Sequence, residues 1–139
     1  PVKIIVLKDD TQTAGQEFFT FTAVSATAPT VSSTTPADNA TGVAVAADVT
    51  VVFSMAMGLA SFVAGETIQL KSVGYTGTAY NDVITISSLT LSSDLLTLTI
   101  AHAADAFGAL TEYQCVISGV RNANGVALAA PYVLTFTTV

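Results

Sequence analysis

The chain is poor in charge. Only 10% of its 139 residues are charged, against about 25% in ordinary soluble domains. Acidic residues outnumber basic ones by ten to four, which gives a net charge of −6. The basic residues are scattered, at Lys3, Lys8, Lys71 and Arg121. Because phosphate recognition needs clustered Lys and Arg, the sequence argues against a nucleic-acid partner and against an anionic membrane surface.

The low charge also predicts how the surface of the protein interacts with water and with other molecules. An isolated globule with so few charges is poorly solvated and tends to associate. We therefore expect neighbouring copies or domains to cover much of the exterior. An exterior of Thr and Ser hydroxyls is the alternative interpretation.

Residues that carry chemistry are scarce as well. The chain has one cysteine, Cys115, one histidine, His102, and no tryptophan. A single cysteine cannot form an internal disulfide, and one His with one Cys cannot supply a zinc site. Neither residue belongs to a recognisable catalytic pattern. We expect Cys115 to be a buried core residue, His102 to lie in a loop after a strand, and the chain not to be an enzyme.

Two further absences narrow the function. No uninterrupted apolar run reaches the roughly 18 residues that a membrane-spanning helix needs, so we predict no membrane span. The carboxylates form no Asp-x-Asp-x-Asp-Gly loop, which argues against a dedicated calcium site. Asp9 and Asp10, together with backbone carbonyls, are the candidate metal ligands, for calcium at a domain junction. Solvation of a turn is their alternative role, and we expect no other cofactor.

What the chain does contain is apolar residues at every second position. Val49, Val51 and Phe53 alternate with polar or smaller residues, and β-branched residues dominate such stretches. This pattern is typical of strands with one buried face. It recurs at 49–53, 67–71, 83–86, 96–100, 113–117 and 132–136. About seven strands at this spacing predict an all-β fold, an antiparallel β-sandwich.

Turn residues divide these strands. Pro29 and Pro36 bracket a short edge-like strand over 30–35, and residues 36–42 read as a turn-rich link. Asn124-Gly125 is a strong hairpin signal between the last two strands. The one helical candidate is 54–63, with Ser54 as its cap.

One tyrosine occupies a special position. Tyr113 lies two residues before Cys115, at the start of a late strand. Sandwich folds place a corner tyrosine there, and its hydroxyl bonds back to the chain. We expect this hydrogen bond here.

The final hairpin has a counterpart at the other terminus. Residues 2–24 and 115–139 both read as an apolar strand, a basic residue, a polar turn and a closing strand. The closing strands are Phe-Thr-Phe-Thr-Ala-Val over 19–24 and Leu-Thr-Phe-Thr-Thr-Val over 134–139. This duplication indicates either the last hairpin of a preceding repeat or a hairpin lent to a neighbouring subunit.

Six segments together resemble bacterial Ig-like domains of the S-layer type: 28–43, 49–57, 95–100, 108–113, 120–128 and 135–138. The resemblance covers about residues 28 to 139. In that family an aromatic residue and Ser are followed by two variable residues and Met, as at 53–57 here. The family often has a charge and Pro where this chain has Met55-Ala56. This departure favours packing of the segment against a neighbour.

The resemblance implies an Ig-like sandwich over 29–139, preceded by a joint at 25–28 and a β-hairpin at 1–24. Because an isolated two-stranded hairpin is marginal in water, we expect the hairpin to pack on another domain or subunit. The expected assembly residues are its apolar side chains, Ile4, Val6, Phe19 and Phe21.

The family is extracellular, found in tandem in surface layers and adhesins, and has no shared catalytic residues. We therefore predict an extracellular structural module whose partners are copies of itself or adjacent repeats. One alternative is an adhesin module that binds a glycan or receptor through loops 72–82 and 101–111, with Tyr75 as a contact. Another is an accessory domain of a secreted enzyme. Asn39-Ala-Thr41 is a glycosylation sequon on a predicted surface turn.

Overall fold

The computed structural model describes residues 27–75 and 82–139. The predicted hairpin over 1–24 lies outside these residues. So do the candidate assembly residues Ile4, Val6, Phe19 and Phe21 and the candidate ligands Asp9 and Asp10, which remain predictions.

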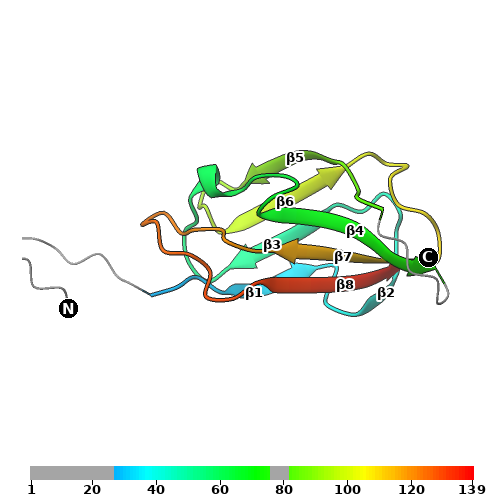
Figure 1. The fold of residues 1–139 in the computed structure, drawn as a ribbon, viewed down its shortest axis with the longest axis horizontal. Helices are drawn as coiled ribbons and strands as arrows, with labels where there is room; N and C mark the ends of the chain where they lie inside the picture. The colour runs from blue at the N-terminus through cyan, green and yellow to red at the C-terminus, as the bar shows by residue number, and fades with distance from the viewer. Residues whose placement is uncertain (1–26, 76–81) are drawn as a thin grey trace, which may run out of the picture.

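Two four-stranded sheets pack face to face (Figure 1). The first sheet has the order β1 (Val31–Thr35), β3 (Val49–Phe53), β6 (Thr97–His102), β5 (Ile86–Leu91). The second has the order β2 (Ala40–Val43), β8 (Tyr132–Thr138), β7 (Thr111–Ile117), β4 (Ile68–Tyr75). One 3-10 turn, η1 (Leu59–Ser61), completes the regular structure of the described residues. The predicted all-β Ig-like sandwich is confirmed.

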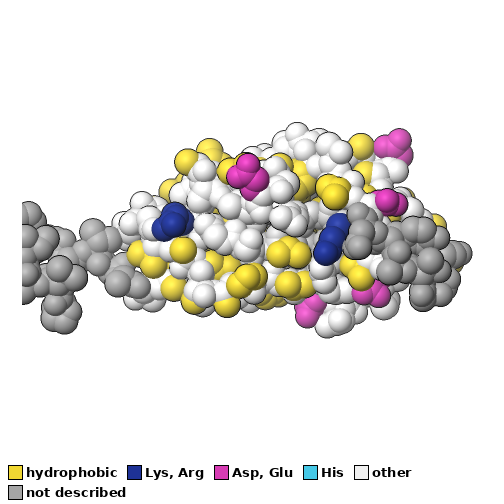
Figure 2. Space-filling model, in the orientation of Figure 1, with side chains coloured by type: hydrophobic (Ala, Val, Ile, Leu, Met, Phe, Trp, Pro, Cys, Tyr) yellow, Lys and Arg dark blue, Asp and Glu magenta, His cyan; other side chains and the backbone are white. Residues whose placement is uncertain are grey.

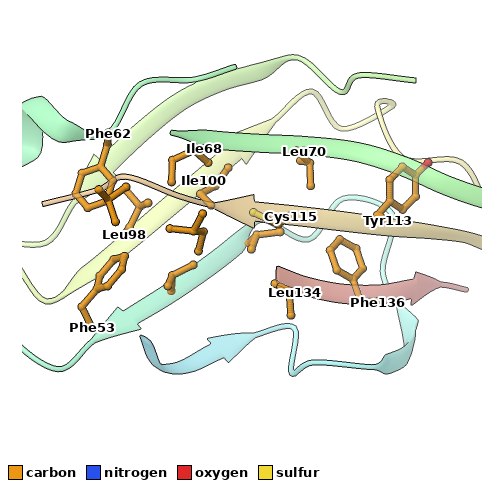
Figure 3. Packing of buried hydrophobic residues seen from close by; sticks show 14 of the residues in the cluster. Phe53, Phe62, Ile68, Leu70, Leu98, Ile100, Tyr113, Cys115, Leu134 and Phe136 are labelled. Carbon is orange, nitrogen blue, oxygen red and sulfur yellow. The ribbon is translucent and has the colours of Figure 1, made fainter. Parts of the chain in front are cut away.

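The core lies between the sheets and follows the predicted alternation. In β3 the side chains of Val49, Val51 and Phe53 are buried, and the two residues between them are half-buried. The same pattern holds in β6, β7 and β8, whose inward residues include Leu98, Ile100, Cys115, Ile117, Leu134 and Phe136 (Figure 3). Because a strand alternates its faces, burial of one face fixes which residues point outward.

The chain changes sheets early. β1 pairs with β3 in the first sheet, and β2 pairs with β8 in the second. The Thr35–Pro36 peptide bond at the crossing is cis. Since β2 runs parallel to β8, the sandwich is antiparallel with this one exception among the described strands. Predicting a turn over all of 36–42 was therefore wrong, because β2 begins at Ala40.

Two other predictions need correction. The helical candidate 54–63 contains only the three-residue η1, and the Ser54 Oγ accepts a hydrogen bond from the Thr30 N–H instead of capping a helix. The strand predicted at 83–86 forms only a bridge between Val83 and Lys71 before β5 begins at Ile86. In both segments tertiary packing determines the backbone, and local propensity is a weak guide.

The hairpin signal at Asn124-Gly125 marks a smaller feature than expected. Residues 118–131 connect β7 to β8, and within them Arg121 and Ala127 form an isolated bridge. Gly125 has φ +84°, which favours glycine in such a turn. The signal correctly predicts a tight turn, but this turn lies inside the connection rather than joining β7 and β8 directly.

The expected corner tyrosine is confirmed. The Tyr113 hydroxyl accepts a hydrogen bond of 2.6 Å from the Gly108 N–H, which fastens the β6–β7 connection to the core. Phe107, Tyr113 and Phe136 have ring centroids 4.3–5.9 Å apart. Such spacing is typical of favourable aromatic clusters.

The described chain enters and leaves the sandwich at opposite ends of its long axis (Figure 1). Thr27–Thr30 lies at one end, called here the N-terminal end, with the connections 54–66 and 118–131. Val139 lies at the other end, where its carbonyl accepts a hydrogen bond from the Leu110 N–H. The molecule is therefore a rod with two distinct ends.

Truncation of Phe136 tests the core. Phe136 is 1% exposed and touches the aromatic cluster. We expect Phe136→Ala to lower the free energy of unfolding by about 3–5 kcal/mol, because a large cavity replaces the ring. Chemical denaturation measures this loss. Val83→Ala, at a side chain 76% exposed, is the matched control and should change stability by about 0.5 kcal/mol at most. A loss below about 1 kcal/mol for Phe136→Ala would contradict the inward placement of its ring.

Candidate functional site

His102 is held within the fold. The sequence predicted a loop position for His102, but it is the last residue of β6, and its side chain is buried. Nε2 lies 2.9 Å from the Ala47 carbonyl oxygen, and Nδ1 lies 2.7 Å from that of Ala103. The ring also stacks on Phe107, with centroids 3.8 Å apart. Each ring nitrogen faces a backbone carbonyl oxygen, and the tautomer decides which nitrogen donates its N–H. The ring therefore lies between the connections 44–48 and 103–110.

Cys115 is a core residue, as expected. Its side chain is fully buried in β7 and belongs to the hydrophobic cluster. Burial raises the pKa of its thiol to about 12. Because the thiolate is the reactive form, a buried thiol of this kind is chemically inert.

No group of three or more His, Cys, Asp or Glu that could hold a metal ion occurs among residues 27–75 and 82–139. In the same part of the chain, no helix is long and apolar enough to cross a membrane. On one face, apolar and uncharged polar atoms dominate and charged side chains stand apart (Figure 2).

The most elaborate polar arrangement lies at the N-terminal end, where the chain enters the sandwich. The buried Asn122 side chain accepts hydrogen bonds through Oδ1 from the N–H groups of Asn124 and Val126, at 3.0 and 2.9 Å. Its Nδ2 donates to the Thr27 carbonyl and to the Met55 sulfur. One side chain therefore joins the turn at 122–126, the segment after β3 and the first described residue.

Asn122 was not singled out from the sequence, although the sequence Asn-Ala-Asn-Gly over 122–125 is typical of a turn.

The segment Met55-Ala56, where this chain differs from the family pattern, has contacts within the chain. Met57 is fully buried, and the Ala123 N–H donates to the Ala56 carbonyl at 2.9 Å. This segment thus packs against a connection of its own chain, while Met55 and Ala56 remain half-buried, and packing of these two residues against a neighbour stays a prediction.

An open, mostly apolar groove lies beside this junction. Its volume is about 300 Å³, and its walls include Pro29 and Val31 on one side and Leu128, Pro131 and Tyr132 on the other. It therefore separates the start of β1 in the first sheet from the start of β8 in the second. The groove thus lies next to the residues through which the described chain enters the sandwich.

The predicted binding loops approach each other at the opposite end. Tyr75 at the end of β4 pairs with Thr111 at the start of β7, and Gly74 pairs with Glu112. The described start of loop 72–82 thus lies at the same end of the sandwich as residue 111 of loop 101–111. Residues 76–81 lie outside the described residues, so the glycan-binding role of this end and of Tyr75 stays a prediction.

Asn39 lies on an exposed turn, as expected. It adopts φ 62°, and its Nδ2 donates to Asp38 Oδ2 at 3.0 Å. Its backbone N–H donates to the Thr135 carbonyl at 2.6 Å. The turn is docked on β8, and glycosylation of Asn39 stays a prediction.

Comparison with known protein families identifies the family of this chain. Residues 25–138 match the family described as bacterial Ig-like domain. The chain belongs to this family. Two features of this structure fit a bacterial Ig-like domain. They are the corner tyrosine, Tyr113, and the arrangement of the strands in two sheets. No curated protein matches the chain.

Two solved structures share the fold. The selenomethionine form of PcoC, a copper resistance protein from Escherichia coli, has a TM-score of 0.64 at 13% identity, with 79% of this chain and 99% of that chain covered. The S-layer protein rSbsC(31-844) has a TM-score of 0.57 at 19% identity, with 80% of this chain covered. The match spans only 14% of the S-layer protein. At these identities the likeness concerns the fold alone.

Burial of Cys115 predicts a pH-dependent stability. The pKa of the Cys115 thiol is raised from 9.0 to about 12 in the folded protein. Between these two pH values the thiol is therefore ionised in the unfolded chain and protonated in the folded one. The stabilising contribution is complete below about pH 9 and is lost as the pH rises toward 12, by up to about 1.4 kcal/mol per pH unit. Chemical denaturation at pH 8 to 11 measures this slope. Cys115→Val should remove that part of the slope; an unchanged slope in the variant would refute the assignment.

Removal of the Asn122 side chain should loosen the N-terminal end. We expect Asn122→Ala to destabilise the protein by about 2–4 kcal/mol, because two N–H groups and a carbonyl lose their partner at a buried site. Hydrogen exchange should accelerate at Asn124 and Val126 more than in β7. Asn124→Ala, at an exposed neighbour, is the control. Equal exchange in both variants would show that Asn122 does not hold this junction.

Proposed function

We propose that the chain is a non-enzymatic extracellular structural module that stacks or self-assembles in a surface layer or filament. One observation chiefly supports this proposal. The described chain enters the sandwich at one end of its long axis and reaches Val139 at the other end (Figure 1). Such a module joins to the next in a single direction. Repeated head-to-tail contacts that do not close into a ring give extended arrays.

The comparisons support a location at the cell surface. The family is that of bacterial Ig-like domains, and a domain of this fold occurs within an S-layer protein. The low charge of the chain, 10% of its residues, fits a surface covered by neighbours. The surroundings of His102, between two backbone carbonyls, and the raised pKa of the buried Cys115 thiol fit a structural role for both residues.

Assembly through β-strand complementation is the mechanism that we favour. The sequence of residues 2–24 follows the pattern of the final hairpin, and such a hairpin needs a partner sheet to be stable. Its alternating apolar side chains, Ile4 and Val6 in one half and Phe19 and Phe21 in the other, are suited to one buried face. The partners are then copies of this chain or adjacent repeats.

An adhesin module is the alternative, in which the end formed by loops 72–82 and 101–111 binds a glycan or receptor. The pairing of Tyr75 with Thr111 brings the described parts of these loops together. A structural role accounts in addition for the low charge and for the repeated hairpin sequence, so we favour it.

Light scattering and electron microscopy of the full chain over a range of concentrations test the proposal. We expect particles heavier than one chain that lengthen in one direction. Phe19→Asp with Phe21→Asp should abolish association, because charges replace the apolar face. Thr20→Asp with Thr22→Asp adds the same charges to the alternate face and should retain it. A native chain that stays monomeric at every concentration overturns the proposal.

A further inference from the structure

The edge of β8 is covered over only part of its length. β2 pairs with β8 at Phe136 and Thr138, in the second half of the strand. Just before this, Thr135 donates its N–H to Asp38 Oδ1 at 2.9 Å and accepts the Asn39 N–H at 2.6 Å. Both main-chain groups of Thr135 therefore point away from β7.

This geometry fixes the direction of the main chain at Val133. Thr135 pairs with Gln114 and Val133 with Val116 in the antiparallel β7–β8 ladder. Because outward-pointing residues alternate along such a ladder, the N–H and C=O of Val133 also point away from β7. In the part of the chain that the structure describes, no hydrogen bond to these two groups is recorded. Among the described residues, the first half of β8 is thus an open strand edge.

The groove at the N-terminal end adjoins this open edge. Pro131 and Tyr132, which precede Val133, form one wall, and Pro29 and Val31 form the other. Tyr132 is half-buried and packs against the core, whereas Val133 is 43% exposed. A strand added to the edge would therefore place one set of side chains in the groove, beside Tyr132, and the alternate set beside Val133.

We propose that this half-edge and its groove accept the N-terminal segment of a second copy of the chain. This inference rests on the proposed function and names the acceptor site. The N-terminal segment, which precedes Thr27, contains Phe-Thr-Phe-Thr over 19–22. The rings of Phe19 and Phe21 suit the apolar groove, and the hydroxyls of Thr20 and Thr22 suit the exposed side. Backbone hydrogen bonds to an open edge supply affinity, and side chains in an adjoining pocket supply specificity.

A second copy is a better occupant than the chain's own segment. Pro29 and Val31 form the groove wall, and Asn122 ties the Thr27 carbonyl at the end of the rod. To fill the groove, the chain's own residues 19–22 would have to reverse direction within residues 23–28. A donated segment from a neighbouring rod needs no such reversal and links successive copies in the direction of the long axis.

Engineered disulfides test the contact. Residues that pair across strands have side chains on the same face, so we substitute Val133→Cys in one full-length protein and Thr20→Cys or Thr22→Cys in another. Native Cys115 does not interfere, because its buried thiol has a pKa of about 12. After mixing under mild oxidation we expect a covalent dimer of the two variants. Val83→Cys, at a residue 76% exposed, is the control partner and should give at least about tenfold less, a difference that corresponds to about 1.4 kcal/mol.

Backbone substitution gives an independent readout. Val133→Pro removes the outward N–H and leaves the β7–β8 hydrogen bonds in place, since proline is tolerated where the N–H faces outward. We expect association to weaken about tenfold or more, which corresponds to about 1.4 kcal/mol, while Val133→Thr keeps it. Far-UV circular dichroism checks that both variants fold; if Val133→Pro does not fold, the disulfide test decides.

The outcomes separate this inference from the proposed function. A native chain that assembles without cross-linking Val133→Cys to Thr20→Cys or Thr22→Cys overturns the acceptor site alone. A variant carrying both cysteines that closes the disulfide within one chain at high dilution also overturns it, because the groove then holds the chain's own segment. A native chain that never assembles overturns both.

Discussion

Burial of every second side chain between two sheets is the constraint on which the rest of this structure depends. Val49, Val51 and Phe53 of the first sheet share one buried cluster with Cys115, Ile117, Leu134 and Phe136 of the second. Figure 3 shows Phe53, Cys115, Leu134 and Phe136 within this cluster. This core is a single hydrophobic cluster of buried residues. The outward positions are free to carry Thr and Ser, which explains how a chain with so few charges forms a stable sandwich.

The connections are fixed by side chains that bond to backbone groups. Tyr113 holds the Gly108 N–H, and Asn122 holds the turn at 122–126 together with Thr27. In the β5–β6 turn, hydrogen bonds from the Ser92 hydroxyl and the Leu96 N–H hold the pKa of Asp94 below its usual range. Buried or bent backbone needs such partners, because an unpaired polar group is costly. Polar residues that suggest chemistry, His102 among them, serve architecture here.

The shape of the molecule and its strand edges are the basis of the proposed function. The rod has distinct ends, and its strand edges differ. β4 is partly covered by the segment 82–84, whose Ile84 N–H donates to the Leu70 carbonyl, and the second half of β8 is covered by β2. No described residue covers the first half of β8, which lies beside an apolar groove. Natural β-proteins cover or blunt exposed edges, so an edge left open next to a shaped hollow is suited to recognition of another strand.

The sequence by itself determined the strands β3, β6, β7 and β8 and their inward faces, because the period of two is a local property that each of these segments carries within five to seven residues. It also identified the corner position of Tyr113, the core role of Cys115 and the exposed turn at Asn39. Tertiary structure decided which sheet each strand joins, the parallel pairing of β2 with β8, the contacts of Asn122 and the open half-edge at Val133. These features depend on registers between segments far apart along the chain, such as Thr135 with Asp38 and Asn39, and local alternation carries no information about such distant pairings.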